Sequence, residues 1–212
     1  MVEFKGTFFK PSGVLYKEPT PIDPSRFADP VALMTEWEPG TDGASFRTHK
    51  LVRVNPNKMA FKMTGQLIAL FSILPLSGVF LLFYVFSGNM SLLPLGLGIV
   101  FVLFGVYLLL YQTDPIIFDK STGLFIKGRK KSDKAPDPDN PKNIVDLDSV
   151  HALQLLSKYV SGKKPYYSHE LNLVLKNGKR MRVISHADKE KFMADVRLLS
   201  EFLGKPVWDA TE

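Results

Sequence analysis

Residues 65–113 read GQLIALFSILPLSGVFLLFYVFSGNMSLLPLGLGIVFVLFGVYLLLYQT, a stretch of 49 residues without one Asp, Glu, Lys or Arg. Charged residues interrupt a soluble helix well before this length, whereas a helix that crosses a bilayer needs about 20 mostly apolar residues. Two such spans fit, at 66–86 and 92–111, separated by the small polar run 87–91. Because that run breaks helices, the stretch predicts a transmembrane helical hairpin rather than a buried hairpin of a soluble protein.

Basic residues flank the hairpin on both sides. Arg47, Lys50, Arg53, Lys58 and Lys62 precede it, and Lys120, Lys127, Arg129, Lys130 and Lys131 follow it. Lys and Arg beside membrane helices are retained in the cytoplasm, so both termini are expected there. The first 64 residues contain no apolar run of the signal-peptide type, and the first span is therefore expected to act as its own insertion signal.

The composition narrows the classes of function. Nine basic and seven acidic side chains precede residue 65, and eighteen and fourteen follow residue 113, which gives a net charge of +6. Such a mild excess suits an anionic inner leaflet better than nucleic acid. The chain has no cysteine, so disulfides, thiolate nucleophiles and cysteine metal sites are excluded. Neither span carries an ionisable residue, which argues against a transporter or pump.

The segments outside the hairpin read mainly as strands. Residues 1–45 are rich in proline and lack periodicity, which predicts an extended arm whose aromatic side chains dock on another surface. Strand-like runs follow at 46–54 and 58–62, joined by the turn Asn55-Pro56-Asn57. After the hairpin, strands at 116–118 and 124–126 flank a turn with Gly123.

Further strands and one helix complete the chain. Alternation of apolar and polar residues predicts a half-buried strand over 144–156, and Asn177-Gly178 predicts a tight hairpin between the strands at 170–175 and 181–183. A helix is expected after an N-cap at Ser185, ending at Gly204 and followed by a tail at 205–212. Its apolar face is formed by Phe192, Val196, Leu199 and Leu203.

Two strands before the hairpin, five after it and one C-terminal helix resemble the inventory of a pleckstrin-homology-like (PH-like) barrel. In this interpretation residues 46–64 complete the domain of residues 114–204, and the transmembrane hairpin over 65–112 is inserted between the second and third strands. The alternative is a separate small α+β domain formed by 114–204 alone. Either way, the expected fold class is an α+β membrane protein with a cytoplasmic β-domain.

The C-terminal half also resembles an uncharacterised family of proteobacterial two-helix membrane proteins. The segments that carry the resemblance are 115–120, 127–130, 151–157, 170–175 and 202–210. The resemblance implies a bacterial inner-membrane protein that acts as the immunity partner of a secreted antibacterial toxin. It supplies no catalytic residue.

Few side chains suggest enzyme chemistry. His169-Glu170 has the first two residues of a zinc-protease motif, but Leu173 stands where the second histidine is needed, so no metal site is expected. His151 lies on an apolar face and is expected to be a hydrogen-bonded core histidine. Asp146 and Asp148 are expected to form a solvated acidic edge. No cofactor is expected, and a hydrolase that uses His151 or His169 is the least supported alternative.

The basic run after the second span has a direct physical use. Each basic group near an anionic leaflet contributes about 1 kcal/mol, so the run is expected to bind lipid head groups or a partner. The expected binding residues are Lys127, Arg129, Lys130, Lys131, Lys163, Lys164, Arg180 and Arg182. A solvated loop that only reflects the charge bias is the alternative. The sequence thus favours a non-enzymatic, membrane-anchored protein that binds a toxin or, alternatively, anionic lipid head groups or a scaffolded membrane complex.

Overall fold

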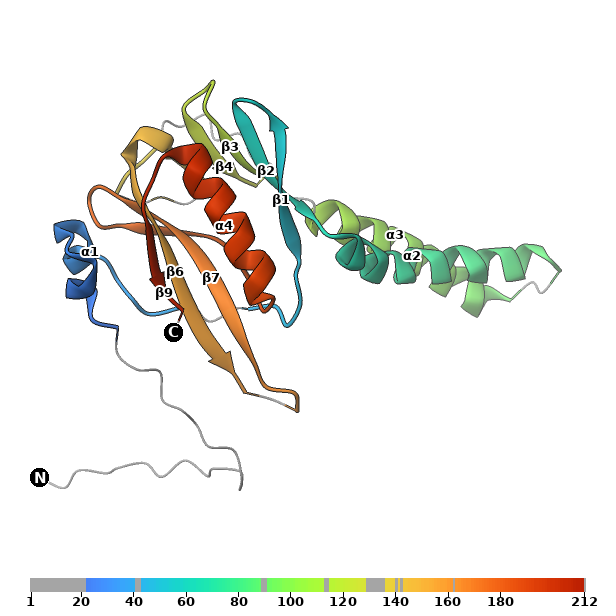
Figure 1. Ribbon diagram of the computed structural model, residues 1–212. Helices are drawn as coiled ribbons and strands as arrows, with labels where there is room; N and C mark the ends of the chain where they lie inside the picture. The colour runs from blue at the N-terminus through green and yellow to red at the C-terminus, as the bar shows by residue number, and fades with distance from the viewer. Residues whose placement is uncertain are drawn as a thin grey trace, which may run out of the picture.

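The computed structural model shows a β-domain from which a long helical hairpin projects (Figure 1). It describes residues 22–40, 43–88, 91–112, 115–128, 136–139, 141, 143–161 and 163–211. The structure is mixed α and β, with two sheets, and two of its helices are long and apolar enough to cross a membrane.

The first sheet has five antiparallel strands in the order β1-β2-β3-β4-β5. They are β1 (His49–Asn55), β2 (Lys58–Met63), β3 (Ile116–Asp119), β4 (Leu124–Lys127) and β5 (Ile144–Asp146). Strands β2 and β3 are neighbours, with Phe61 opposite Ile116, although the helical hairpin separates them in sequence. The strands on either side of the hairpin therefore belong to one sheet.

The second sheet has the order β8-β7-β6-β9. Strands β6 (Val150–Val160), β7 (Tyr166–Leu175) and β8 (Arg180–His186) form an antiparallel meander, and β9 (Val207–Ala210) pairs in parallel with β6. Gly178 has φ +78° in the predicted turn between β7 and β8, a conformation that glycine adopts without a steric penalty. Half of the tail expected at 205–212 is strand β9, which lies at the edge of this sheet.

The expected strand over 144–156 is divided in two. The 3-10 turn η2 (Leu147–Ser149) separates β5 in the first sheet from β6 in the second. Asp146 caps this turn by accepting a hydrogen bond from the Asp148 backbone at 3.0 Å. Short polar side chains that bind nearby backbone favour turns over strands, which explains the interruption.

Helix α4 (Lys189–Leu203) covers the core between the sheets. Phe192, Val196 and Leu199 are buried on its predicted apolar face, and it ends at Gly204 with φ +65°. The N-cap is Asp188 rather than the expected Ser185, because Ser185 is still paired with Glu170 in the second sheet.

The described part of the N-terminal arm is folded onto the β-domain. It contains the 3-10 turn η1 (Pro24–Phe27) and the short helix α1 (Pro30–Met34). Phe27 stacks on Trp37 with 4.9 Å between ring centroids, and both rings contact Trp208 of β9 at 5.9 Å. The aromatic residues of the arm therefore dock on this chain's own second sheet; residues 1–21 of the arm lie outside the described residues.

Helices α2 (Gly65–Phe86) and α3 (Leu92–Gln112) pack against each other and expose most of their other side chains. Phe83 is 70% exposed and Leu92 is 87% exposed. The two glycines Gly98 and Gly105 lie at the contact between the helices: a Cβ at Gly105 would fall 2.3 Å from Cδ of Pro75. These two glycines therefore allow the helices to approach closely, whereas Gly96 faces open space.

Candidate functional site

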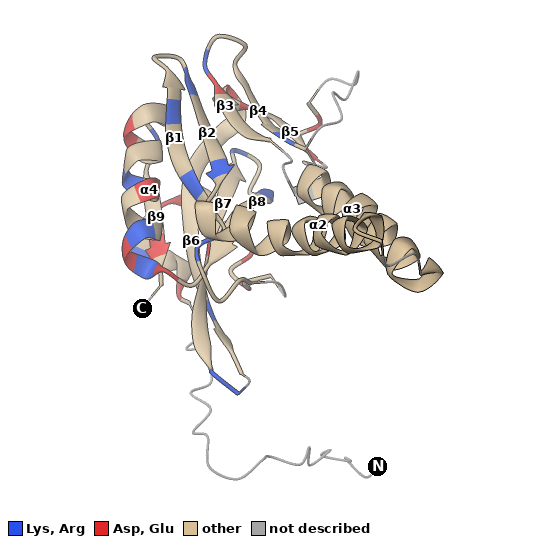
Figure 2. Cartoon of the chain, turned by 90° about the vertical axis from the view of Figure 1, so that its right-hand side faces the viewer, with Lys and Arg blue, Asp and Glu red and all other residues tan. Residues whose placement is uncertain are grey.

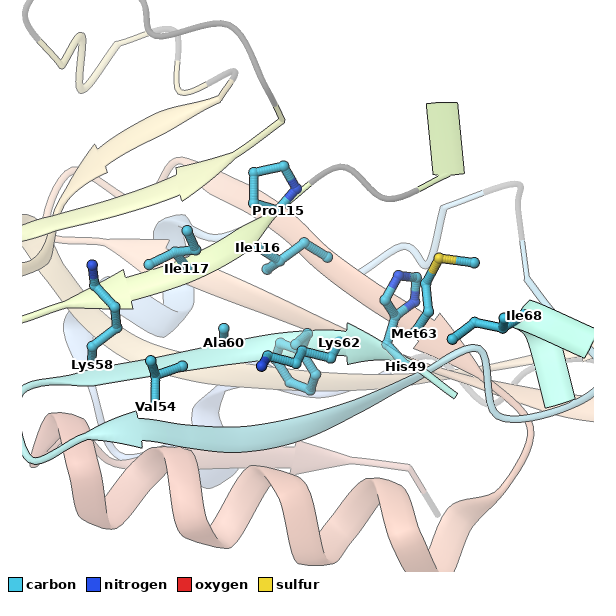
Figure 3. Close-up of a pocket in the computed structure, with 11 residues that line it drawn as sticks. His49, Val54, Lys58, Ala60, Lys62, Met63, Ile68, Pro115, Ile116 and Ile117 are labelled. Carbon is cyan, nitrogen blue, oxygen red and sulfur yellow. The ribbon is translucent and has the colours of Figure 1, made fainter. Parts of the chain in front are cut away.

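An open groove of about 480 Å³ lies where the first sheet meets the hairpin (Figure 3). Ala60 and Ile117 belong to its floor, on the face of the sheet opposite the core, and Ile68 of α2 closes one end. Ile117 and Ala60 are two members of an apolar row that crosses the outer face of all five strands. The row, read from the strand register, is Val52, Ala60, Ile117, Ile126 and Ile144.

Lysines border this apolar surface on the side of the hairpin. Lys62 lines the groove and lies directly opposite Lys50 on the neighbouring strand. Both side chains are exposed, and neither forms an ion pair with any residue that the structure describes. Like charges directly opposite on a sheet repel each other, so the pair forms an uncompensated positive site.

Lys58 borders the other end of the groove and differs from this pair (Figure 3). Its Nζ lies 2.7 Å from Oδ2 of Asp119, directly opposite on β3. Hydrogen bonds from Lys58 and from Ser121 lower the pKa of Asp119 to about 2, so this carboxylate is ionised at neutral pH. Lys58 is therefore neutralised within the sheet, and the free positive charge is concentrated near α2.

Three of the predicted binding residues are engaged inside the protein. Lys127 shares the inner face of β4 with Phe125, and its Nζ donates to the Arg182 carbonyl at 3.0 Å. Burial lowers the pKa of the Lys127 ammonium. Arg180 donates to Glu36 of the arm at 3.1 Å, and both Arg180 and Arg182 lie 3.9 Å from buried Glu170. These contacts hold the arm on the second sheet.

The remaining predicted residues are separated from that cluster or not described. Lys163 and Lys164 lie in the connection between β6 and β7, beyond the Val160–Tyr166 pair. Arg180 and Arg182 pair with Val174 and Asn172, six or more positions along β7 from Tyr166, or about 20 Å at the usual rise per residue. Arg129, Lys130 and Lys131 lie outside the described residues. Among the described members, the structure brings together only Lys127, Arg180 and Arg182.

The histidines form separate structural contacts. His169 Nδ1 lies 2.7 Å from Ser157 Oγ, but the pair is largely buried beside Phe192 of α4, and burial lowers the pKa of His169. His151 Nε2 lies 2.7 Å from Asp29 Oδ2 and thereby fixes the start of α1. His186 is fully buried, and neither ring nitrogen has a hydrogen-bond partner within the described structure.

The described residues include no group of three or more His, Asp or Glu side chains that could hold a metal ion. The sequence matches no protein-family model, and a comparison with curated proteins found no match. The geometry of the hairpin and of the groove at its foot is therefore the main guide to function. The sequence contained a signal for this pair: a hairpin around Asn55-Pro56-Asn57 sets Lys50 and Lys62 opposite each other.

Proposed function

We propose that this protein is a membrane-anchored, non-enzymatic binding protein whose hairpin spans a bilayer and whose β-domain lies at the cytoplasmic surface. The observation that carries the proposal is the exposure of the apolar side chains on α2 and α3. Their 22 and 21 residues correspond to about 32 Å of helix, which matches the hydrocarbon core. Only 11% of the most apolar window of either helix is buried, unlike a core helix of a soluble protein.

The attachment of the hairpin supports the topology. Helix α2 begins two residues after β2, and α3 is followed by β3, the direct neighbour of β2. The two ends of the hairpin are therefore attached at the same end of the neighbouring strands β2 and β3. The hairpin itself carries no charged residue (Figure 2). With the flanking basic residues, this arrangement supports a location of both termini in the cytoplasm of a bacterial inner membrane.

We also propose that the β-domain is PH-like. The order of elements along the chain supports this assignment. A first antiparallel meander of β1 to β5 is followed by a second of β6 to β8 and then by helix α4 across the core. The described residues form more strands than the seven expected, because the strand expected over 144–156 is divided into β5 and β6 and because β9 was not expected. A domain of this kind, held close to the bilayer, gains a high effective concentration for any partner that acts there.

A single-cysteine experiment tests the anchor and its orientation, because the native chain has no cysteine. In spheroplasts, S87C at the end of α2 should react with a membrane-impermeant maleimide, whereas S161C between β6 and β7 should react only after permeabilisation. The protein should also stay in the membrane pellet at alkaline pH. Release into the supernatant, or labelling of S161C from outside, would refute the proposal.

Neutralisation of a secreted antibacterial toxin stays a prediction about the partner, supported by the family resemblance. Co-expression with toxins encoded beside the gene should restore growth if the prediction holds. A non-enzymatic role further requires that S157A and H169A variants that fold normally restore growth equally well. Loss of rescue in either variant would favour the hydrolase alternative.

A further inference from the structure

We propose that the groove at the foot of the hairpin, together with Lys50 and Lys62, is a binding site for one anionic glycerophospholipid of the surrounding leaflet. The inference rests on the proposed membrane anchor and deepens it by naming a ligand class and a site. The phosphate would lie between the two ammonium groups, and the upper part of an acyl chain would lie against Ala60 and Ile117.

The position of the site favours a lipid over other occupants. Lys62 is three residues before the start of α2, and Ile68 of the first turn of α2 closes the groove. In an inserted hairpin, these residues are at the level where head groups meet hydrocarbon. Long basic side chains at that level direct their charge toward head groups while their stems contact apolar groups.

The chemistry of the surface agrees with this position. The groove joins an almost entirely apolar floor to Lys62, and Lys50 lies directly opposite Lys62 on β1. Its volume of about 480 Å³ lies within the usual range for small-molecule sites. An isolated sheet with two lysines opposite each other is destabilised by their repulsion, and a bound phosphate removes it. A zwitterionic lipid carries its own positive charge and compensates the pair less well.

Native mass spectrometry of the full chain tests the site. The protein is released from vesicles of phosphatidylcholine that contain increasing amounts of phosphatidylglycerol, and retained lipids are counted. We expect K50Q/K62Q to weaken phosphatidylglycerol retention about tenfold to thirtyfold, because each lysine should contribute about fivefold to the affinity for the lipid. K163Q/K164Q removes the same charge at the distant β6–β7 connection and should retain lipid like the wild type.

A second variant tests the groove without changing charge. A60L introduces a larger apolar side chain on the floor and should reduce retention, while thermal unfolding verifies that the β-domain is intact. Unchanged retention in K50Q/K62Q would overturn the site, as would unchanged retention in A60L or an equal loss in K163Q/K164Q. Dimers held through the groove, seen in place of retained lipid, would also overturn it.

Failure of the site is distinguishable from failure of the anchor. The hairpin is identical in these variants, so each should sediment with membranes as the wild type does. An anchored K50Q/K62Q variant with unchanged lipid retention refutes the lipid site alone. A wild-type protein that does not sediment with membranes refutes the anchor and, with it, the premise of the site.

Discussion

Arg47 and Asp195 form an ion pair, with 2.5 Å between Nη2 and Oδ2, that joins the segment before β1 to helix α4. The side chains are 19% and 7% exposed, so the pair is largely removed from solvent. Burial raises the pKa of the Asp195 carboxyl even with the Arg47 guanidinium beside it. The pair therefore links the segment that leads into β1 to the helix that closes the core.

We expect R47M to destabilise the β-domain by about 3 kcal/mol, because it leaves a buried carboxylate without its partner. Chemical unfolding in detergent, followed by tryptophan fluorescence, measures the change. The double variant R47M/D195L removes both charges and should recover most of the loss. An equally unstable double variant would show that packing, rather than charge compensation, dominates at this position.

The contact of Gly105 with Pro75 sets the distance between helices α2 and α3. A side chain at 105 would meet both the ring and the backbone nitrogen of Pro75, so G105L should separate the helices and destabilise the hairpin by about 2 kcal/mol or more. G96L is the matched control, because a Cβ there meets nothing within 4 Å. Cross-linking of cysteine pairs across the hairpin should fall in G105L and not in G96L.

The stack of Phe27, Trp37 and Trp208 should hold the arm on the second sheet. Truncation of Trp37 to Ala removes the ring contacts and the hydrogen bond from Nε1 to the Ala32 carbonyl at 2.9 Å. We expect W37A to cost about 3 kcal/mol locally and to make the arm the first site of limited proteolysis. L33A, at an exposed position of α1, should leave the cleavage pattern unchanged.

The sequence predicts those features that depend on local patterns. Lipid excludes charge over a continuous stretch, so the hairpin is visible in residues 65–113 without any knowledge of the fold. Period-two alternation likewise predicts most strands, and Asn177-Gly178 predicts its turn. The inward direction of Lys127 could also have been predicted from the sequence, because Lys127 lies two residues after Phe125 and therefore on the same face of β4.

Features that depend on contacts between residues far apart in the sequence could not be predicted from local patterns. Strand β9 has only four residues and is stabilised by its parallel pairing with β6, about fifty residues earlier in the chain. The arm has no periodicity of its own, and its fold depends on Trp208 and on the Arg180–Glu36 contact. The lysine pair differs from these features, because the turn at Asn55-Pro56-Asn57 sets the register of β1 and β2 that places Lys50 opposite Lys62.

Fully buried His186 should make the stability of the β-domain depend on pH. Burial, followed by the charge of Arg47, lowers the pKa of its imidazole from 6.5 to about 4. The unfolded chain therefore binds a proton between pH 6.5 and 4 when the folded chain does not, and the free energy of unfolding must fall as the pH falls through this window. Above pH 6.5 the contribution is constant.

The loss across that window should reach about 3 kcal/mol, from 1.36 kcal/mol per pKa unit. Unfolding followed by the fluorescence of Trp37 and Trp208, at pH values from 4 to 8, measures it. H186L keeps an apolar group beside Phe192 and should reduce the slope of the profile between pH 4 and 6.5. If H186L retains the wild-type slope, another group controls the acid sensitivity. In that case protonation of His186 does not lower the free energy of unfolding.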